Sequence, residues 1–230
     1  MEINGFLKMT LLDFPGKVAC TIFCGGCNFR CPFCHNAFLV TELEKAESFS
    51  EVEVLNFLNK RQGLLDGVCI TGGEPLLQPD LEEFIRKIKS MGFLVKLDTN
   101  GYLTDRLQHL VNEGIIDYVA MDIKNSPKKY ALTAGLKEIE TERIKESVDF
   151  LINGKIDYEF RTTVANELHD IEDIKAIGKL IKGAKRYFIQ NFEDSGNLIG
   201  EGLSPVSEEN LLKMQQIATD FVSNSQIRGS

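Results

Sequence analysis

Residues Val18–Cys34 read VACTIFCGGCNFRCPFC, in which a short apolar run leads directly into a loop rich in cysteine. The run contains β-branched residues and predicts a buried β-strand. The loop carries Cys27, Cys31 and Cys34 at the spacing C-x3-C-x2-C, which supplies three thiolate ligands rather than the four of a closed structural site. Because catalytic metal sites keep one coordination position free, this stretch predicts a strand that ends in a reactive metal site.

The three-cysteine loop is typical of a [4Fe-4S] cluster in which one iron lacks a protein ligand and is open to a small molecule. Zinc is one alternative, with Cys24 and Cys27 as the first ligand pair and Cys31 and Cys34 as the second. Zinc ribbons separate their pairs by roughly 15–20 residues, whereas these pairs lie close together in the sequence. A thioredoxin-like redox pair of Cys31 and Cys34 would leave the third cysteine unexplained, so we favour the cluster.

Composition places the chain among soluble globular proteins, because 43% of its 230 residues are apolar and 26% are charged. The formal net charge is −8 and no Lys/Arg stripe stands out, which argues against a nucleic-acid partner. No apolar run reaches the roughly 18 residues of a membrane span, and Asp13 and Lys17 interrupt any signal-peptide pattern. We therefore expect a cytoplasmic protein without membrane or nucleic-acid partners, whose clustered cysteines serve metal or redox chemistry.

Strand-like and helix-like segments alternate along the chain. Short runs rich in apolar residues predict strands at Val18–Phe23, Gly67–Thr71, Leu94–Leu97, Tyr118–Ile123, Tyr158–Val164 and Arg186–Phe192. Helical spacing or capping residues predict helices from Ser50 to about Arg61, from Asp80 to about Gly92, and over Thr104–Glu113, about Glu140–Asn153, about Asp170–Ile181 and about Ser207–Val222. This alternation predicts an α/β fold with a parallel sheet.

Polar or unusual residues stand at the end of one predicted strand after another. Beyond the cysteine loop they are Gly72-Gly73-Glu74-Pro75, Asp98-Thr99-Asn100-Gly101, Asp122-Ile123-Lys124, Arg161-Thr162-Thr163 and Gln190-Asn191. In a barrel of parallel strands these residues would meet at the C-terminal face, whereas an open doubly wound sheet would spread them along an edge. We therefore expect an incomplete (β/α)6 barrel in a single domain over residues 1–227. The closing Arg228-Gly229-Ser230 is interpreted as an expression scar.

The residues around the cysteines resemble the radical S-adenosylmethionine (SAM) superfamily. The three loop cysteines, with the aromatic Phe33 ahead of the last of them, are similar to its cluster motif. The longer run Gly26–Asn36, and Asp13–Gly16 ahead of the first strand, resemble the activating enzymes of glycyl-radical enzymes. Among these, the similarity is greatest to the longer activating proteins of anaerobic ribonucleoside-triphosphate reductase. The resemblance extends over about Gly5–Phe192.

The resemblance implies a [4Fe-4S] cluster on the three loop cysteines and a molecule of SAM that binds the open iron through its amino and carboxylate groups. Phe33 belongs to the implied cofactor site. Gly72, Gly73 and Glu74 resemble the segment that holds the methionyl amino group, since glycines let a backbone approach a ligand closely. The alternative for this segment is an ordinary turn followed by a helix-initiating proline.

Two further strand ends are implied to shape the SAM site. Lys124 would face the methionyl carboxylate, and Asp98 and Asp122 would line the site or hold a monovalent cation. Asn100 is included among the cofactor-binding candidates. Its alternative is a plain turn, because Asn-Gly is a common turn pair.

The remaining candidates each have a structural alternative. Arg161 would pair with the SAM carboxylate or form a structural ion pair, and Gln190 would contact the adenosine or hydrogen-bond at a strand edge. Cys24 could ligate the cluster in the absence of SAM, although we favour packing as a small apolar residue. His35 is not expected to bind iron, because it would fill the open position.

The family resemblance also implies a reaction. A reduced cluster cleaves SAM to methionine and a 5′-deoxyadenosyl radical, and in the activating enzymes that radical takes the Cα hydrogen of one glycine on a partner glycyl-radical enzyme. We expect an anaerobic radical SAM oxidoreductase of this kind, with anaerobic ribonucleoside-triphosphate reductase as partner and a flavodoxin- or ferredoxin-type protein as electron donor. Segment 37–49 is a candidate for partner binding.

Three other functions stay open at this point. The partner could be a pyruvate formate-lyase-like enzyme, or the substrate could be a small molecule such as a nucleoside precursor. The third is an iron–sulfur electron carrier or zinc module without SAM chemistry, which would leave the glycine-rich and aspartate strand ends without a purpose.

Overall fold

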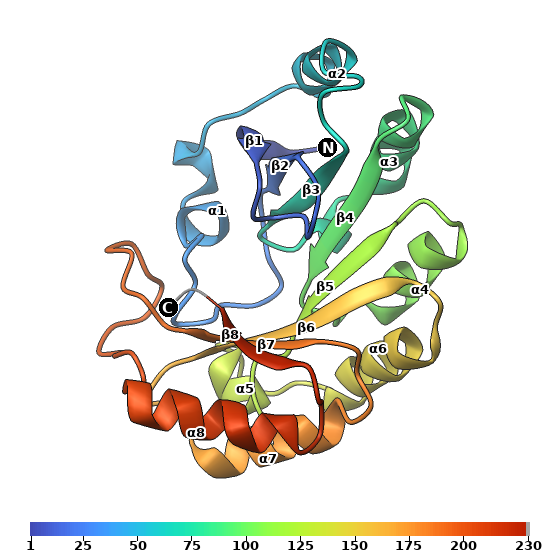
Figure 1. Cartoon of the computed structure of the whole chain (residues 1–230). Coiled ribbons are helices and arrows are strands. Elements are labelled where there is room, and N and C mark those ends of the chain that lie inside the picture. Colours follow the sequence, from blue (N-terminus) through green and yellow to red (C-terminus); the bar gives the residue numbers. More distant parts are fainter. Residues whose placement is uncertain (229–230) are drawn as a thin grey trace. The chain divides into compact units, whose positions relative to one another are not determined.

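The computed structural model describes residues 1–228, and strands and helices alternate along it (Figure 1). The strands are β1 (Ile3–Thr10), β2 (Ala19–Cys24), β3 (Gly67–Gly72), β4 (Leu94–Thr99), β5 (Tyr118–Asp122), β6 (Asp157–Val164), β7 (Tyr187–Asn191) and β8 (Ser225–Arg228). The α-helices are α1 (Phe38–Thr41), α2 (Glu51–Asn59), α3 (Leu81–Ser90), α4 (Thr104–Asn112), α5 (Tyr130–Thr133), α6 (Thr141–Asn153), α7 (Ile171–Leu180) and α8 (Glu208–Thr219). Short 3₁₀ turns lie at η1 (Leu43–Lys45) and η2 (Pro75–Leu77).

The strands follow one another in the sheet in chain order, from β1 to β8. The pairs β2–β3, β3–β4, β6–β7 and β7–β8 are parallel, and a helix separates the two strands of each pair in the sequence. Such connections are those of βαβ units. The α/β fold class and the strand succession of an incomplete (β/α)6 barrel are confirmed.

Each of the six strands and six helices expected from the sequence is present, whereas the outermost strands β1 and β8 were not predicted. Strand β1 runs antiparallel to β2 and is interrupted by register shifts, and Leu7, Lys8 and Met9 on it are exposed. A strand with so little burial lacks the alternating apolar pattern from which strands are recognised. Strand β8 is only four residues long and includes Gln226 and Arg228, so its sequence is equally weak as a strand signal.

The chain divides into two compact units, of which the first comprises Met1–Asn28, Phe38–Thr99 and Asp105–Val119. Its core is built from the apolar residues of β2, β3 and β4 and from the apolar face of α3. On α3 the fully buried residues are Leu81, Phe84, Ile85 and Ile88. Helix α2 packs beside α3, and the predicted capping box at its start is confirmed, because the Glu53 N–H donates to Ser50 Oγ and the Ser50 N–H donates to Glu53 Oε2.

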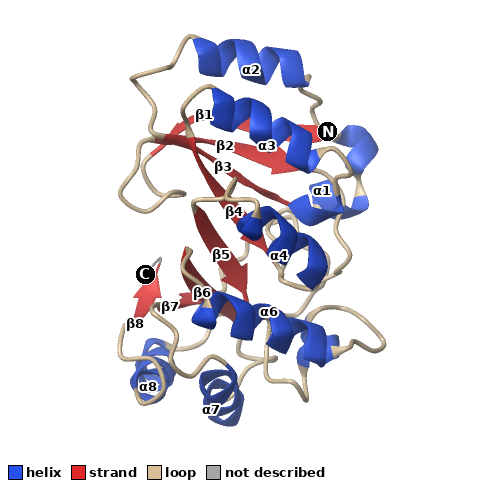
Figure 2. Cartoon of the chain, turned by 90° about the vertical axis from the view of Figure 1, so that its right-hand side faces the viewer, coloured by secondary structure: helices blue, strands red, loops and turns tan. Residues whose placement is uncertain are grey.

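The second unit comprises Phe29–Ala37, Asn100–Thr104 and the chain from Ala120 on. Helices α7 and α8 lie side by side (Figures 1 and 2) and bury apolar residues such as Ile174, Ile177 and Met214. In the β6–β7 pair Phe160 stands opposite Tyr187, and both are fully buried.

Arg228, which the sequence analysis grouped with the expression scar, lies in β8. Its guanidinium binds the carboxylate of Glu159 at 2.7 and 3.0 Å, and Glu159 is 1% exposed. Gly229 and Ser230 lie outside the described residues. The single-domain expectation over residues 1–227 and the origin of the last three residues stay predictions.

None of the helices within residues 1–228 is long and apolar enough to cross a bilayer. The cytoplasmic location stays a prediction.

Candidate functional site

In the first unit, the loops that follow β2 and β3 are joined through their backbones. Cys24 stands opposite Gly72 in the parallel pair, so the two strands end at the same level. The Gly73 N–H donates to the Cys24 carbonyl at 2.8 Å, and the Glu74 N–H donates to the Gly26 carbonyl at 2.8 Å. The glycine-rich loop is thus hydrogen-bonded to Cys24 and Gly26, the residues that lead into Cys27.

Close backbone packing explains the two glycines of this loop. Gly72 has a φ of 111°, and a Cβ there would lie 2.5 Å from the Cys24 backbone. A Cβ on Gly73 would lie 2.0 Å from the Gly26 carbonyl oxygen, where no side chain fits. The sequence analysis explained these glycines by the close approach of a ligand. In the structure they also allow the backbone of Cys24 and Gly26 to pack closely against them. Their contact with SAM stays a prediction.

The carboxylate of Glu74 lies between the ends of β3 and β4. It is 1% exposed and accepts hydrogen bonds from the Leu76 N–H at 3.1 Å and from the Thr99 hydroxyl at 2.8 Å. A buried carboxylate requires such partners. Thr99 was not among the predicted site residues, but its hydroxyl orients the carboxylate of the predicted residue Glu74.

Asp98 forms an ion pair with Lys96 on the same strand, because residues two apart on a strand share a face. Lys96 is 2% exposed, and its Nζ also lies 3.5 Å from the sulfur of Cys69. Asp98 was predicted to bind a ligand, and in the structure its carboxylate is paired with the buried Lys96. The sequence analysis did not identify Lys96 as its partner.

The cysteines of the first unit differ in their surroundings. Cys20, Cys24 and Cys69 are fully buried, as expected for core residues. Burial and the charge of Glu74 raise the pKa of Cys24 to about 12, so its thiol stays protonated at neutral pH. This agrees with the packing role favoured for Cys24. Cys27 is partly exposed, and its sulfur lies 3.8 Å from the side-chain oxygen of Asn28.

In the second unit, the other two loop cysteines are linked by a turn in which the Cys34 N–H donates to the Cys31 carbonyl at 3.1 Å. Burial raises the pKa of the Cys31 thiol to about 11, and the positive charge of Lys124 acts in the opposite direction. Burial likewise raises the pKa of Cys34. Lys124 and Asp122 lie close enough to act electrostatically on both cysteines, so the structure brings together four of the predicted site residues.

Asp122 is the centre of a three-residue charge cluster. Its Oδ1 binds Arg161 Nε at 2.8 Å and its Oδ2 binds Lys124 Nζ at 3.1 Å. Desolvation would raise the pKa of Asp122, but the charges of Arg161 and Lys124 outweigh it and hold that pKa below its usual value. Desolvation would lower the pKa of Lys124, and Asp122 outweighs it. All three side chains are therefore charged at neutral pH, with a net charge of +1.

Helix α5 is fastened to the cysteine loop within the second unit. The Arg30 N–H donates to the Ala134 carbonyl at 2.8 Å, and a Cβ on Gly135 would lie 1.9 Å from the Arg30 carbonyl oxygen. The rings of Phe29 and Tyr130 meet edge to face with centroids 6.5 Å apart. Tyr130 at the start of α5 and the two residues after its end therefore lie against the residues just before Cys31.

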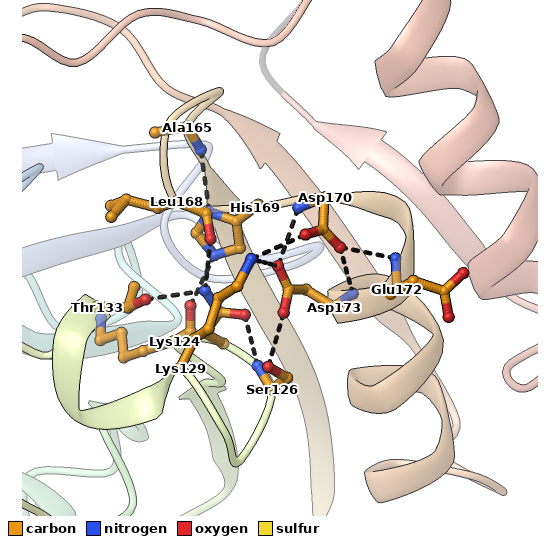
Figure 3. A network of polar contacts seen from close by, with 11 residues as sticks. Lys124, Ser126, Lys129, Thr133, Ala165, Leu168, His169, Asp170, Glu172 and Asp173 are labelled. Atoms are coloured by element: carbon orange, nitrogen blue, oxygen red, sulfur yellow. Dashed lines mark hydrogen bonds and ion pairs between the residues drawn. The ribbon is translucent and has the colours of Figure 1, made fainter.

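His169 fixes the backbone at Lys124 (Figure 3). The Ala165 N–H donates to His169 Nδ1 at 3.2 Å, so the other ring nitrogen, Nε2, carries the proton that is donated to the Lys124 carbonyl at 2.9 Å. Burial lowers the pKa of His169, which favours this neutral form. The ring centroid of Phe33 lies 6.4 Å from that of His169, so Phe33 packs near the residue that positions Lys124.

The segment after β5 is bound to the start of α7 by a second set of polar contacts (Figure 3). Ser126 Oγ donates to Asp173 at 2.7 Å, and Lys129 binds Asp170 at 2.9 Å and Asp173 at 2.6 Å. Asp170 and Asp173 also form the capping box of α7. The pattern Asp170-x-x-Asp173 ahead of a helix was the available sequence signal, but its contacts with Ser126 and Lys129 depend on the fold.

Two further predicted residues, Asn100 and Gln190, and the residue His35, which was not expected to bind iron, lie as follows. Asn100 Oδ1 accepts from the Tyr102 N–H at 3.0 Å, which agrees with the bend considered for it. Gln190 is partly exposed in β7, and its contact with adenosine stays a prediction. The ring of His35 lies 6.3 Å from that of Phe192.

The residues present fit a thiolate-bound cluster with SAM, on the chemistry of their donors. No disulfide joins the cysteines of the described residues, and the Cys31–Cys34 segment lies beside a cationic lysine that favours an anionic ligand. Within residues 1–228 no three His, Cys, Asp or Glu side chains are gathered as a ready ion site. The cluster assignment therefore rests on the cysteine spacing and on the comparisons that follow.

The family model of the radical SAM superfamily matches residues 21–181. A protein of Methanocaldococcus jannaschii, provisionally named a glycyl-radical enzyme activating enzyme, is 33% identical over 98% of this chain and 95% of its own length. The pyruvate formate-lyase-activating enzyme of Clostridium pasteurianum is 30% identical over 54% of this chain and 52% of its own. The crystal structure of Streptococcus suis SuiB bound to S-adenosylmethionine covers 89% of this chain and 48% of that one, with a TM-score of 0.68 at 15% identity, which shows the shared fold.

Proposed function

The chain belongs to the radical SAM superfamily, and we propose that it activates a glycyl-radical enzyme by removing the Cα hydrogen of one glycine on that partner. The observation that carries the proposal is the 33% identity to the provisionally named activating enzyme, which extends over nearly the whole of both chains. The family implies a [4Fe-4S] cluster and SAM. When bound, they supply an electron and a carbon radical able to take hydrogen from an unactivated C–H bond.

The chain's own residues would hold these groups. Cys27, Cys31 and Cys34 would bind the cluster, and Lys124, kept charged by Asp122, would attract the carboxylate of SAM. Arg161 also binds Asp122, so the three side chains Asp122, Lys124 and Arg161 together carry a net positive charge. This charge suits an anionic ligand. Phe33 and the segment Gly72–Glu74 are also proposed to bind the cofactor, because the family resemblance implies this role for them.

We propose anaerobic ribonucleoside-triphosphate reductase as the partner, on the resemblance of Gly26–Asn36 to its activating proteins. A pyruvate formate-lyase-like enzyme is the second candidate, because the activating enzyme of C. pasteurianum is 30% identical over about half of this chain. The electron would come from a flavodoxin- or ferredoxin-type protein in the cytoplasm. The experiment must also distinguish a protein partner from a small-molecule substrate.

The experiment is an anaerobic activation assay with purified candidate partners. The reconstituted, reduced protein is mixed with SAM and each partner, and the glycyl radical is detected by electron paramagnetic resonance while 5′-deoxyadenosine is quantified. We expect a glycyl-radical signal with the reductase and a matching amount of 5′-deoxyadenosine. Formation of 5′-deoxyadenosine without a radical on either partner would instead favour a small-molecule substrate.

A monovalent cation at Asp98 is a further part of the proposal, and it would have to share this carboxylate with Lys96. Replacing Lys96 with Met should therefore make SAM affinity more dependent on added K⁺ than in the wild type. Equal K⁺ dependence of the two proteins in a binding titration would argue against a cation at this carboxylate.

A further inference from the structure

Tyr130 is a buried tyrosine whose hydroxyl has no hydrogen-bond partner in the described part of the chain. The side chain is 1% exposed at the start of α5, and among residues 1–228 its hydroxyl has no hydrogen-bond partner. The backbone N–H of Lys124 acts to lower the phenol pKa, and the stronger effect of burial raises it. An N–H group can serve only the oxygen, so the hydroxyl proton is left without an acceptor.

The position of Tyr130 is set by contacts with the cysteine loop. Its ring meets that of Phe29, and α5 is joined to this loop by the hydrogen bond from Arg30 to Ala134. The hydroxyl lies close enough to Lys124, Cys31 and Asp122 for their charges to act on it. It therefore lies among the second-unit residues assigned to the cluster and to SAM.

A hydroxyl buried without an acceptor destabilises a folded protein, and phenylalanine would fill the same space without that cost. The two anionic groups expected beside Cys31 and Lys124 would each satisfy the donor. We propose that the Tyr130 hydroxyl donates a hydrogen bond to an anionic acceptor of the bound cofactors, either a sulfur of the cluster at Cys31 or the carboxylate of SAM at Lys124. This rests on the superfamily's cofactors and is independent of which partner is activated.

The test compares Tyr130→Phe with Tyr187→Phe. Tyr187 is an equally buried tyrosine of the same unit, but its hydroxyl already donates to Thr162 Oγ1 at 2.8 Å. Each full-length variant is measured without cofactors by thermal unfolding. After reconstitution, each is measured by redox titration of the cluster without SAM and by a SAM binding titration.

The proposal predicts opposite behaviour of the two variants. Tyr130→Phe should unfold at the same or a higher temperature than the wild type without cofactors, whereas Tyr187→Phe should unfold at a lower one. With cofactors, loss of the Tyr130 hydroxyl should shift the cluster potential to more negative values if the acceptor is sulfur, since a donor stabilises the more negative reduced cluster. It should weaken SAM binding by about tenfold if the acceptor is the carboxylate. Tyr187→Phe should change neither.

Two results would overturn the proposal. A drop in unfolding temperature of Tyr130→Phe comparable to that of Tyr187→Phe would mean that the chain itself satisfies the hydroxyl. A reconstituted Tyr130→Phe with wild-type cluster potential and wild-type SAM affinity would mean that the cofactors do not accept its hydrogen bond. Neither result depends on glycyl-radical formation, so failure of the proposed function would be recognised separately.

Discussion

Two cations of the second unit, Arg161 and Lys124, bind the same carboxylate, that of Asp122. Asp122 is 32% exposed at its side chain and is bound by both Arg161 and Lys124. The sequence analysis considered Arg161 as a partner of the SAM carboxylate or as part of a structural ion pair. The observed ion pair with Asp122 supports the second role, and Lys124 is a cation whose charge acts on both Cys31 and Cys34.

Replacing Arg161 with Met should lower the free energy of unfolding by about 1–3 kcal/mol at pH 7, because Asp122 loses its shortest charge-assisted hydrogen bond. The folded-state pKa of Asp122 lies below its unfolded value of about 3.9. The contribution of the pair is therefore fully present above that value and is lost as pH falls through it toward the folded-state pKa. The gap between wild type and variant should be constant from about pH 8 to 5 and narrow below about pH 4.

Urea unfolding at several pH values measures this gap. Lys213→Met is the matched control, because its partner Glu209 is 79% exposed and exposed ion pairs of this kind contribute little to stability. A loss no larger than that of the control at pH 7, or a gap that widens on acidification, would contradict the assignment.

The cysteines should separate into ligands and core residues. Cys31→Ala should lose nearly all cluster iron after reconstitution, whereas Cys24→Ala should retain close to the wild-type amount, because Cys24 lies in strand β2 opposite Gly72 and is fully buried there. Iron analysis and visible absorbance decide the point. Loss of iron from Cys24→Ala would show that Cys24 is a ligand and would revive the four-thiolate alternative.

Spacing within a few residues was enough to predict the cysteine motif and the polar strand ends from the sequence. Tyr130, His169, Thr99 and Lys96 were not found, because their roles come from contacts across the fold. His169 reaches Lys124 across 45 positions in the sequence and Thr99 reaches Glu74 across 25. No local pattern encodes such pairings, and a single buried lysine or tyrosine is more often a satisfied core residue than part of a site.

At the scale of elements, the rigid connection between the β2 and β3 loops is the feature that positions Cys27. Two backbone hydrogen bonds and the absence of side chains at Gly72 and Gly73 make this connection possible. The helices and strands around it were predictable because their apolar periodicity is strong. Strands β1 and β8 were not, since an exposed edge strand or a four-residue strand leaves little pattern.

Gly73→Ala should disturb this connection, because its Cβ would overlap the Gly26 carbonyl. We expect a loss of at least about 2 kcal/mol in unfolding free energy and poor cluster incorporation. Gly63→Ala is the control, since Gly63 has a φ of 75° and open space around a Cβ. That variant should lose about 1–2 kcal/mol for its backbone conformation alone and incorporate iron normally. Equal iron incorporation by the two variants would contradict the positioning role.

At the scale of the whole molecule, the predicted family and α/β fold are confirmed, whereas the identity of the partner stays a prediction. The cysteine motif lies within residues 21–181 that match the radical SAM superfamily, and the strand succession is that of its fold. The reductase is proposed from the resemblance of Gly26–Asn36 alone, because the surfaces that bind a protein partner need not share a motif. The identity of the hydrogen donor must therefore come from a measurement of the atom transferred.

The most direct test follows that hydrogen atom. The reconstituted, reduced protein is incubated anaerobically with SAM and with anaerobic ribonucleotide reductase in which the glycines carry deuterium at Cα, and 5′-deoxyadenosine is examined by mass spectrometry. The account predicts 5′-deoxyadenosine that contains one deuterium and a glycyl radical on the reductase. Unlabelled 5′-deoxyadenosine, formed equally with and without the deuterated partner, would contradict glycine as the hydrogen donor.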